Sequence, residues 1–308
     1  MSGRPDWTLA HAPLAPFAHP RTAVPPGIAP LDEAAWLYDA DDRAGQLRLK
    51  AAILLGEGTI GAAGDASALG PPAMIHDEGG RAAAEELRDA VLAHAEAAGL
   101  GRRDGGHWRS REGAATPLDL DPMTVAGAAT AEDWLVMEKR SGDAEHVLTA
   151  GVLAFPAFWT LSEKIGRPLL RIHRPVPDYE GDLARRVQRF FDGVRVGRPL
   201  WRANWHFSAS PDIVTPMGEA RKGALYEDRM PQAERAEWLR VERQTILRLP
   251  RTGAAVFGVR TLVSQVEGLT DAQWRGLHAT LAAMTPAERA RKAPEALFRR
   301  AAARAAAA

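Results

Sequence analysis

The chain has 308 residues, enough for one large or two small domains with a buried core. Its 39 basic and 39 acidic residues balance, so charge predicts no general attraction to nucleic acid or to an anionic membrane. The absence of cysteine excludes disulfides, cysteine-ligated iron–sulfur clusters and a thiolate haem ligand. No run approaches the roughly 20 apolar residues of a membrane span, and the start lacks a signal-peptide pattern, so we expect a cytoplasmic protein with no membrane partner.

The first 122 residues predict helices behind an extended arm. Residues 1–30 are rich in proline, which favours an extended arm. Residues 31–55 are predicted to be largely helical, and residues 81–99 form a clear helical pattern with one apolar stripe. The glycine-rich segments 56–72 and 101–122 are predicted to be loops.

The middle of the chain predicts a strand and short helical pieces. Residues 147–155 are apolar and predict a strand. Thr160 and Glu163 have the spacing of a capping box, so a short helix is expected there, ending near Gly166. Residues 169–173 predict a short buried segment.

Residues 182–192 predict an amphipathic helix, with Arg185, Arg186 and Arg189 opposite its apolar face. That basic face either docks a redox partner or is simply solvated.

Residues 201–208 alternate between apolar and polar side chains, which predicts a strand. Arg202, Asn204 and His206 would share its polar face, opposite the tryptophans.

The last third predicts a hairpin followed by helices. Residues 241–249 and 254–263 flank a Pro-Arg-Thr-Gly turn and favour a β-hairpin. Capping patterns that begin at Thr270 and Thr285 predict two helices, and the tail after Arg299 is expected to fray. The order of elements indicates an α+β fold with an antiparallel sheet. No phosphate-binding loop, dinucleotide fingerprint, serine-hydrolase elbow or His-Glu-x-x-His motif occurs.

Three motifs occur in order: GVLAFPAFWTLSEKIGRPLLRIHRPVPDYE at 151–180, WRANWHF at 201–207 and RVERQTILRLPRTGAAVFGVRT at 240–261. Together they resemble the haem-dependent oxidative N-demethylase α-subunit-like family. The resemblance implies a PAS-like fold that carries haem b and oxidises a small methylated amine with O₂ and external electrons. It implies one haem-binding domain over 31–308, with its core motifs in 147–265.

Two histidines are candidates for the iron ligand. His173 follows an apolar run, and Pro175 and Pro177 stiffen the chain after it, which suits a fixed imidazole beside an apolar cavity. The resemblance favours His173, because it is the histidine of the Ile-His-x-Pro-Val-Pro motif. His206 is the rival, since it shares a strand face with Arg202 and Asn204. Either histidine could instead be an ordinary core residue bonded to a carbonyl group.

Further residues are candidates for contacts with the haem. Arg202 suits a bidentate contact with a haem propionate, and Asn204 lies beside it, with Trp205 flanking both. Arg243, in the hairpin, is a second propionate candidate, with Glu242 and Gln244 facing the opposite side. The alternative for a lone arginine is a surface ion pair.

Acidic and phenolic residues are candidates for catalysis. Tyr179 could donate a hydrogen bond to substrate or oxygen, or could simply pack at a helix start. Glu57 could hold an alkylammonium ion, or could be a solvated helix end; Glu132 is another acidic candidate.

The sequence and the resemblance together predict a haem monooxygenase that demethylates a small amine such as dimethylamine and releases formaldehyde. With no cysteine for thioether links, the haem would be non-covalent. With no flavin or nicotinamide signature in the chain, electrons would come from a separate flavin or iron–sulfur reductase subunit. The alternative is a haem-based PAS-like gas or redox sensor without oxygenase activity.

Overall fold

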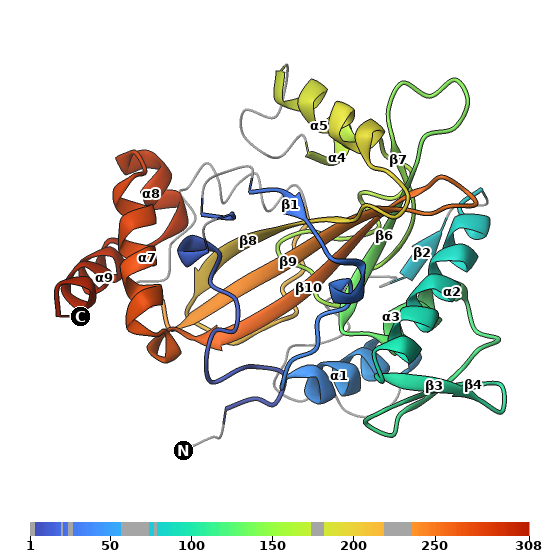
Figure 1. The fold of residues 1–308 in the computed structure, drawn as a ribbon, viewed down its shortest axis with the longest axis horizontal. Coiled ribbons are helices and arrows are strands. Elements are labelled where there is room, and N and C mark those ends of the chain that lie inside the picture. Colours follow the sequence, from blue (N-terminus) through green and yellow to red (C-terminus); the bar gives the residue numbers. More distant parts are fainter. Residues whose placement is uncertain are drawn as a thin grey trace.

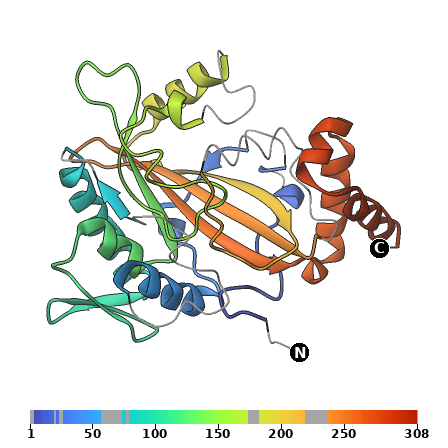
Figure 2. The ribbon, with the colours of Figure 1, turned by 180° about the vertical axis from the view of Figure 1, so that it is seen from behind.

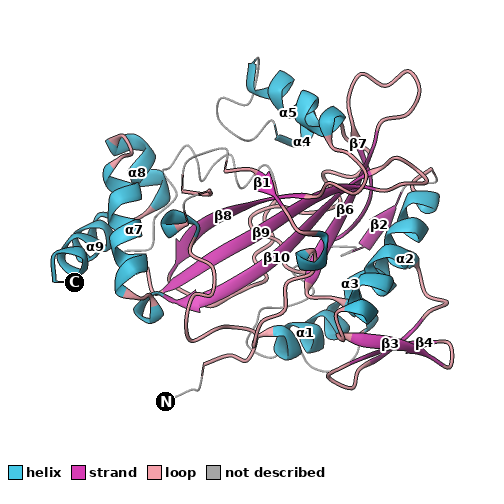
Figure 3. Cartoon of the chain, in the orientation of Figure 1, coloured by secondary structure: helices cyan, strands magenta, loops and turns pink. Residues whose placement is uncertain are grey.

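The computed structural model describes residues 4–19, 21–23, 27–56, 74–76, 79–173, 182–218 and 236–307. Within these ranges the fold is α+β, as the sequence predicts (Figures 1 and 3). None of the helices in these ranges is long and apolar enough to cross a membrane.

The α-helices are α1 (Arg43–Leu55), α2 (Arg81–Ala97), α3 (Pro122–Ala129), α4 (Leu169–His173), α5 (Asp182–Gly193), α7 (Asp271–Ala282), α8 (Pro286–Lys292) and α9 (Glu295–Ala307). Short 3-10 helices lie at Pro16–Ala18, Glu33–Ala35 and Val266–Gly268. The strands are β1 (Ala29–Pro30), β2 (Met74–His76), β3 (Gly101–Asp104), β4 (His107–Ser110), β5 (Ala115–Pro117), β6 (Glu132–Glu138), β7 (Val147–Val152), β8 (Leu200–Ser208), β9 (Trp238–Arg248) and β10 (Ala255–Gln265).

The described strands build a central seven-stranded sheet in the order β1-β8-β9-β10-β6-β7-β2, and every pair in it is antiparallel. The β9–β10 hairpin that the sequence predicts is confirmed, with strands longer than expected. Gly253 has a positive φ of 71°, which explains a glycine at that tight connection. Strand β8 is also confirmed, one residue earlier than predicted.

The prediction of a loop over residues 101–122 is wrong. The segment holds a three-stranded antiparallel sheet, β3-β4-β5, and the start of α3. Gly105 and Gly106 have φ values of 56° and 78° between β3 and β4, as a two-residue hairpin turn requires. The glycines therefore mark a hairpin turn.

Three helical expectations need correction. Residues 161–166 form turns and no helix. The Thr160 hydroxyl bonds to the Glu163 carboxylate, and the Gly166 N–H donates to the carbonyl of Leu148 in β7. In the range 31–55, where a largely helical segment is predicted, the α-helix begins only at Arg43, and the chain before it has one short 3-10 helix, Glu33–Ala35. The segment 169–173 is the helix α4, with Leu170 exposed, so it is only partly buried.

The tail after Arg299, expected to be a helix end that frays, is the end of the helix α9, which runs from Glu295 to Ala307. Leu297 and Ala301 are buried in a cluster with Trp274 of α7. This packing holds the helix, because tertiary burial stabilises a helix more than local propensity does.

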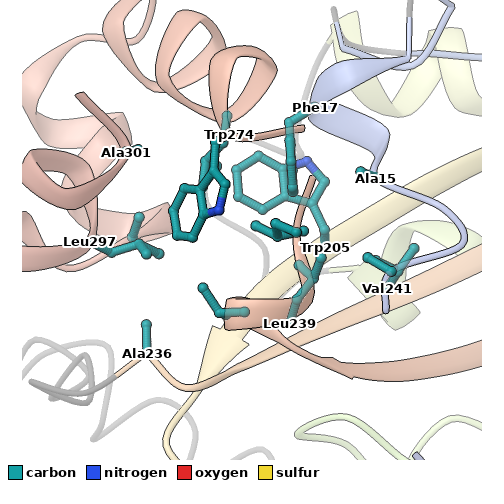
Figure 4. Packing of buried hydrophobic residues seen from close by; sticks show 14 of the residues in the cluster. Ala15, Phe17, Trp205, Ala236, Leu239, Val241, Trp274, Leu297 and Ala301 are labelled. Carbon is teal, nitrogen blue, oxygen red and sulfur yellow. The ribbon is translucent and has the colours of Figure 1, made fainter. Parts of the chain in front are cut away.

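One face of the sheet is thoroughly covered. The N-terminal arm and α7–α9 pack on it around Leu239, Val241 and Leu262. Figure 4 shows Phe17 and Trp205 side by side in this cluster, with ring centroids 5.2 Å apart in an edge-to-face arrangement. Nearer β6, helices α2 and α3 cover the same face in a second cluster that includes Trp36, Leu87, Met123, Trp134 and Val256. We call this side the covered face.

Candidate functional site

The opposite side of the sheet carries a row of polar and apolar side chains that are only partly buried. Arg202 of β8 pairs with Gln244 of β9, and Gln244 pairs with Val259 of β10, so the three side chains share one face. The β8–β10 face consists of Arg202, Asn204, His206, Glu242, Gln244, Phe257 and Val259, all partly buried. Figure 2 shows the molecule from this side.

Two covers flank the β8–β10 face. At one end, Arg240 donates hydrogen bonds to Ile213 O and Phe155 O, both at 2.7 Å, which holds two loop segments against the sheet. Asp133 adds to this by accepting from the N–H groups of Ala154 and Phe155. At the other end, α4 and α5 pack on the sheet in a cluster that includes Leu135, Leu161, Leu169, Ile172 and Phe191.

Arg202 has no hydrogen-bond or ion-pair partner within the described residues, and its Nε atom is buried. Burial lowers the pKa of its guanidinium, and the negative charge of Glu242 opposes that effect. An unpaired guanidinium in a partly desolvated place is costly. The position is therefore suited to an anionic ligand.

His206 is a neutral imidazole without a hydrogen-bond partner among the described residues. Its ring lies 5.5 Å from the ring of Phe158, measured between centroids. Burial, then the positive charges of Arg240 and Lys292, lower the pKa of His206 to about 3. At neutral pH the imidazole therefore keeps a free lone pair, which is the form that binds a metal.

His173 is the last residue of α4, and its side chain lies outside what the structure describes. Ile172, directly before it, packs in the cluster with Leu135. Leu135 pairs with Phe257, so it belongs to the same side of the sheet as Arg202. The backbone at the end of α4 thus lies over this side. Tyr179 and Glu57 fall outside the described residues.

The structure does not bring Arg243, Trp205 or Glu132 together with Arg202. Arg243 points to the covered face, where it donates to Trp36 O at 3.1 Å and to Ala35 O. Trp205 lies in the buried cluster of Figure 4. Glu132 is buried and accepts a hydrogen bond from the Tyr38 N–H at 2.8 Å. The reason is the strand register, which pairs Arg243 with Ala203 and so places it one pleat away from Arg202.

Lys292 is a neighbour of this face that sequence reasoning missed. Its Nζ donates to Trp205 O at 2.9 Å and lies 3.4 Å from Asn204 Oδ1. Burial, and then the charge of Arg202, lower its pKa to about 8. The capping pattern at Thr285 does predict the helix that carries Lys292, but nothing in the local sequence predicts where that helix docks.

The described residues fit a haem in their chemistry. His206 offers a neutral nitrogen ligand, Arg202 an unpaired cation for a propionate, and Phe257 and Val259 apolar contact for a macrocycle.

Comparison with known families agrees with this chemistry. The family model described as haem-dependent oxidative N-demethylase, alpha subunit-like, matches residues 101–292, which is 192 of the 308 residues. The match includes the whole β8–β10 face, the end of α4 and Lys292. The chain therefore belongs to the haem-dependent oxidative N-demethylase alpha-subunit-like family.

Proposed function

We propose that this chain is the haem-binding subunit of an oxidative N-demethylase and acts on a small methylated amine such as dimethylamine. The observation that carries the proposal is a partly exposed sheet face on which a guanidinium and a neutral imidazole both lack partners among the described residues. A ligand that contains a metal and carries a negative charge would satisfy both groups, the metal binding the imidazole and the anion the guanidinium. The family match supports haem as that ligand.

We take the haem to be haem b, as the resemblance implies, and to be bound non-covalently, because the chain has no cysteine to form thioether links. We propose His173 as the iron ligand, because it stands in the Ile-His-x-Pro-Val-Pro motif and follows Ile172, which packs on the same side of the sheet. His206 is the second candidate, supported by its neutral ring. Arg202 and Asn204 bind a propionate of the haem. We also propose that the sheet has a PAS-like arrangement.

When bound, the haem supplies an iron that activates O₂. In the overall reaction the methyl carbon is oxidised to formaldehyde, which takes one oxygen atom of O₂. The other oxygen atom leaves as water, with two external electrons and two protons. Within the chain, Glu57 holds the alkylammonium by charge pairing, and Tyr179 donates a hydrogen bond to substrate or oxygen.

The electrons come from a separate flavin or iron–sulfur protein, in agreement with the family description of an alpha subunit. A basic patch on α5 would receive this partner. Arg185 and Arg189 are exposed there, and the side chain of Arg186 lies outside the described part. Steering by such a patch weakens as salt is added. A cytoplasmic location completes the proposal.

The test is the absorption spectrum and turnover of the purified protein. We expect a Soret band, a haem b pyridine spectrum, and release of formaldehyde from dimethylamine with O₂ and a suitable reductase. A protein that stays colourless after addition of haemin would exclude the haem proposal. A coloured protein whose spectrum and turnover respond to no methylated amine would instead support the sensor function.

Two variants identify the ligand. His173→Ala should weaken haemin binding or change the spin state of the iron, and His206→Ala should do so less. The opposite ranking would assign the iron to His206. The matched control is His94→Ala: His94 of α2 packs against the Trp36 ring on the covered face, away from α4 and the β8–β10 face, so its removal should leave the haem spectrum unchanged.

A further inference from the structure

The outer edge of β8 is where α8 meets the β8–β10 face. Strand β8 pairs with β9 from Leu200 to Ser208, whereas β1 covers its other edge only at Leu200 and Trp201. Beyond Trp201, Lys292 at the end of α8 reaches this edge. It bonds to Trp205 O, and its Nζ lies 4.6 Å from the centre of the Trp205 ring.

From that position Lys292 spans both sides of the strand. The Trp205 ring belongs to the covered face, while Asn204, whose Oδ1 lies 3.4 Å from Lys292 Nζ, belongs to the β8–β10 face. Asn204 is two residues from Arg202 on the same strand face. The guanidinium, the carboxamide and the ammonium therefore follow one another along the edge.

The charges at this edge do not balance within the described residues. Arg202 and Lys292 are both positive, and their mutual repulsion helps to lower the pKa of Lys292. Glu242 is the carboxylate whose charge acts on both cations. Its Oε2 accepts from Gln244 at 3.1 Å, and its Oε1 lies 3.8 Å from Arg240 Nε, so it is shared with other groups.

Within the described residues, two partly desolvated cations share one carboxylate, which favours binding of an additional anion. A carboxylate suits them, because its two oxygens match the guanidinium fork and still leave a lone pair for an ammonium. We propose that Arg202 and Lys292, with Asn204 between them, form a two-cation carboxylate-binding site at the edge of β8. The carboxylate is a propionate of the haem or belongs to the substrate. The first source rests on the proposed function, and the site itself does not.

The first experiment compares haemin with haemin dimethyl ester, in which both carboxylates are blocked. Apo-protein is titrated with each compound and binding is followed by absorbance. If the carboxylate is a propionate, wild-type protein binds haemin more tightly than the ester. Arg202→Gln and Lys292→Gln should each weaken haemin binding about 10-fold or more, the scale of a charge-assisted hydrogen bond, and leave ester binding unchanged.

The second experiment tests a carboxylate on the substrate. Holo-protein is titrated with N-methylglycine, which has a carboxylate, and with dimethylamine, which has none. If the site binds the substrate, haemin and its ester bind wild-type protein equally well. N-methylglycine should then shift the haem spectrum, and its apparent affinity should fall about 10-fold in either variant, as expected for loss of a charge-assisted contact.

Two controls separate charge from structure. Lys292→Arg keeps the positive charge, so it should retain the preference for haemin or the response to N-methylglycine. If the lysine had a purely structural role, restoring the charge alone would not retain either. Arg289→Gln removes a cation from the same helix whose guanidinium lies over the ring of Phe298, so it should change neither. Circular dichroism checks the fold of each variant.

If the protein binds no haem, the proposed function fails, but the site is still testable. Calorimetry with acetate on apo-protein should then give a heat that either glutamine variant abolishes. The site proposal is overturned if haemin and its ester bind all variants alike and no carboxylate compound depends on Arg202 or Lys292.

Discussion

Buried arginines of the central sheet differ in whether the protein supplies their hydrogen-bond partners, and Arg260 and Arg202 are the two extremes. On the covered face, Arg260 is fully buried and donates to Tyr38 O at 3.1 Å and to Gln46 Oε1 at 2.7 Å, besides its ion pair with Asp42. On the other side, Arg202 is partly buried and finds no partner among the described residues. Burial of an arginine is thus a poor indicator of a binding site. An arginine without a protein partner is a better indicator, because its hydrogen-bond donors remain available to a ligand.

The prediction with the largest expected effect on stability compares two arginine substitutions in the apo-protein. Arg260→Met should lower the free energy of unfolding by about 3–5 kcal/mol, since it leaves Asp42 buried without its partner. Arg202→Met removes an unpaired cation and should change it by less than about 1 kcal/mol, or raise it. Urea unfolding measures both. Equal losses would mean that Arg202 has a structural partner after all.

A second test compares two apolar residues on one strand, β10. Leu262, on the covered face, is 2% exposed, while Val259 lies partly exposed on the β8–β10 face. Leu262→Ala should cost about 2–5 kcal/mol by leaving a cavity, and Val259→Ala less than about 1 kcal/mol, because water already reaches that side chain.

Haemin sharpens the same comparison. Bound ligand adds stability in proportion to the logarithm of its affinity. Val259→Ala should reduce the added stability, whereas Leu262→Ala should leave it intact, as measured by urea unfolding with and without haemin. If Leu262→Ala reduced it and Val259→Ala did not, haem would bind away from the β8–β10 face.

The sequence predicts those features of the site that depend on residues close together in the chain. The alternation in β8 correctly places Arg202, Asn204 and His206 on one face, because a period of two is written within a single strand. The hairpin is predicted equally well, since its turn and both strands are contiguous. The glycine-rich hairpin of β3 and β4 was missed because its turn residues also mark ordinary loops.

The local sequence does not predict how elements far apart in the chain pack against one another. Arg243 shares a motif with Glu242, yet only the register of β9 against β8 shows that it lies on the covered face. Lys292 could not be found at all from periodicity. Its role depends on the docking of α8 at the edge of β8, which is a property of the tertiary packing.

The smallest predicted effect concerns the pH dependence of that lysine in the apo-protein. Burial and the charge of Arg202 lower the pKa of Lys292 to about 8, while Glu242 acts in the opposite direction. Unfolding restores the ordinary pKa, near 10.4. Between these values the unfolded chain binds a proton that the folded chain does not, so stability must rise with pH over this window.

Lys292→Met should therefore lose a pH-dependent term that wild-type protein has. The unfolding free energy of wild-type protein relative to this variant should rise by on the order of 2 kcal/mol between about pH 8 and pH 10.5, and stay level below pH 8, where lysine is protonated in both states. Arg289→Met is the matched control, because arginine stays protonated throughout and cannot alter the slope. Urea unfolding at pH 7, 8, 9 and 10 measures each difference. Parallel curves for wild type and Lys292→Met would show that the ammonium is not desolvated, and the edge of β8 would then lack the second uncompensated charge that distinguishes this face from the covered one.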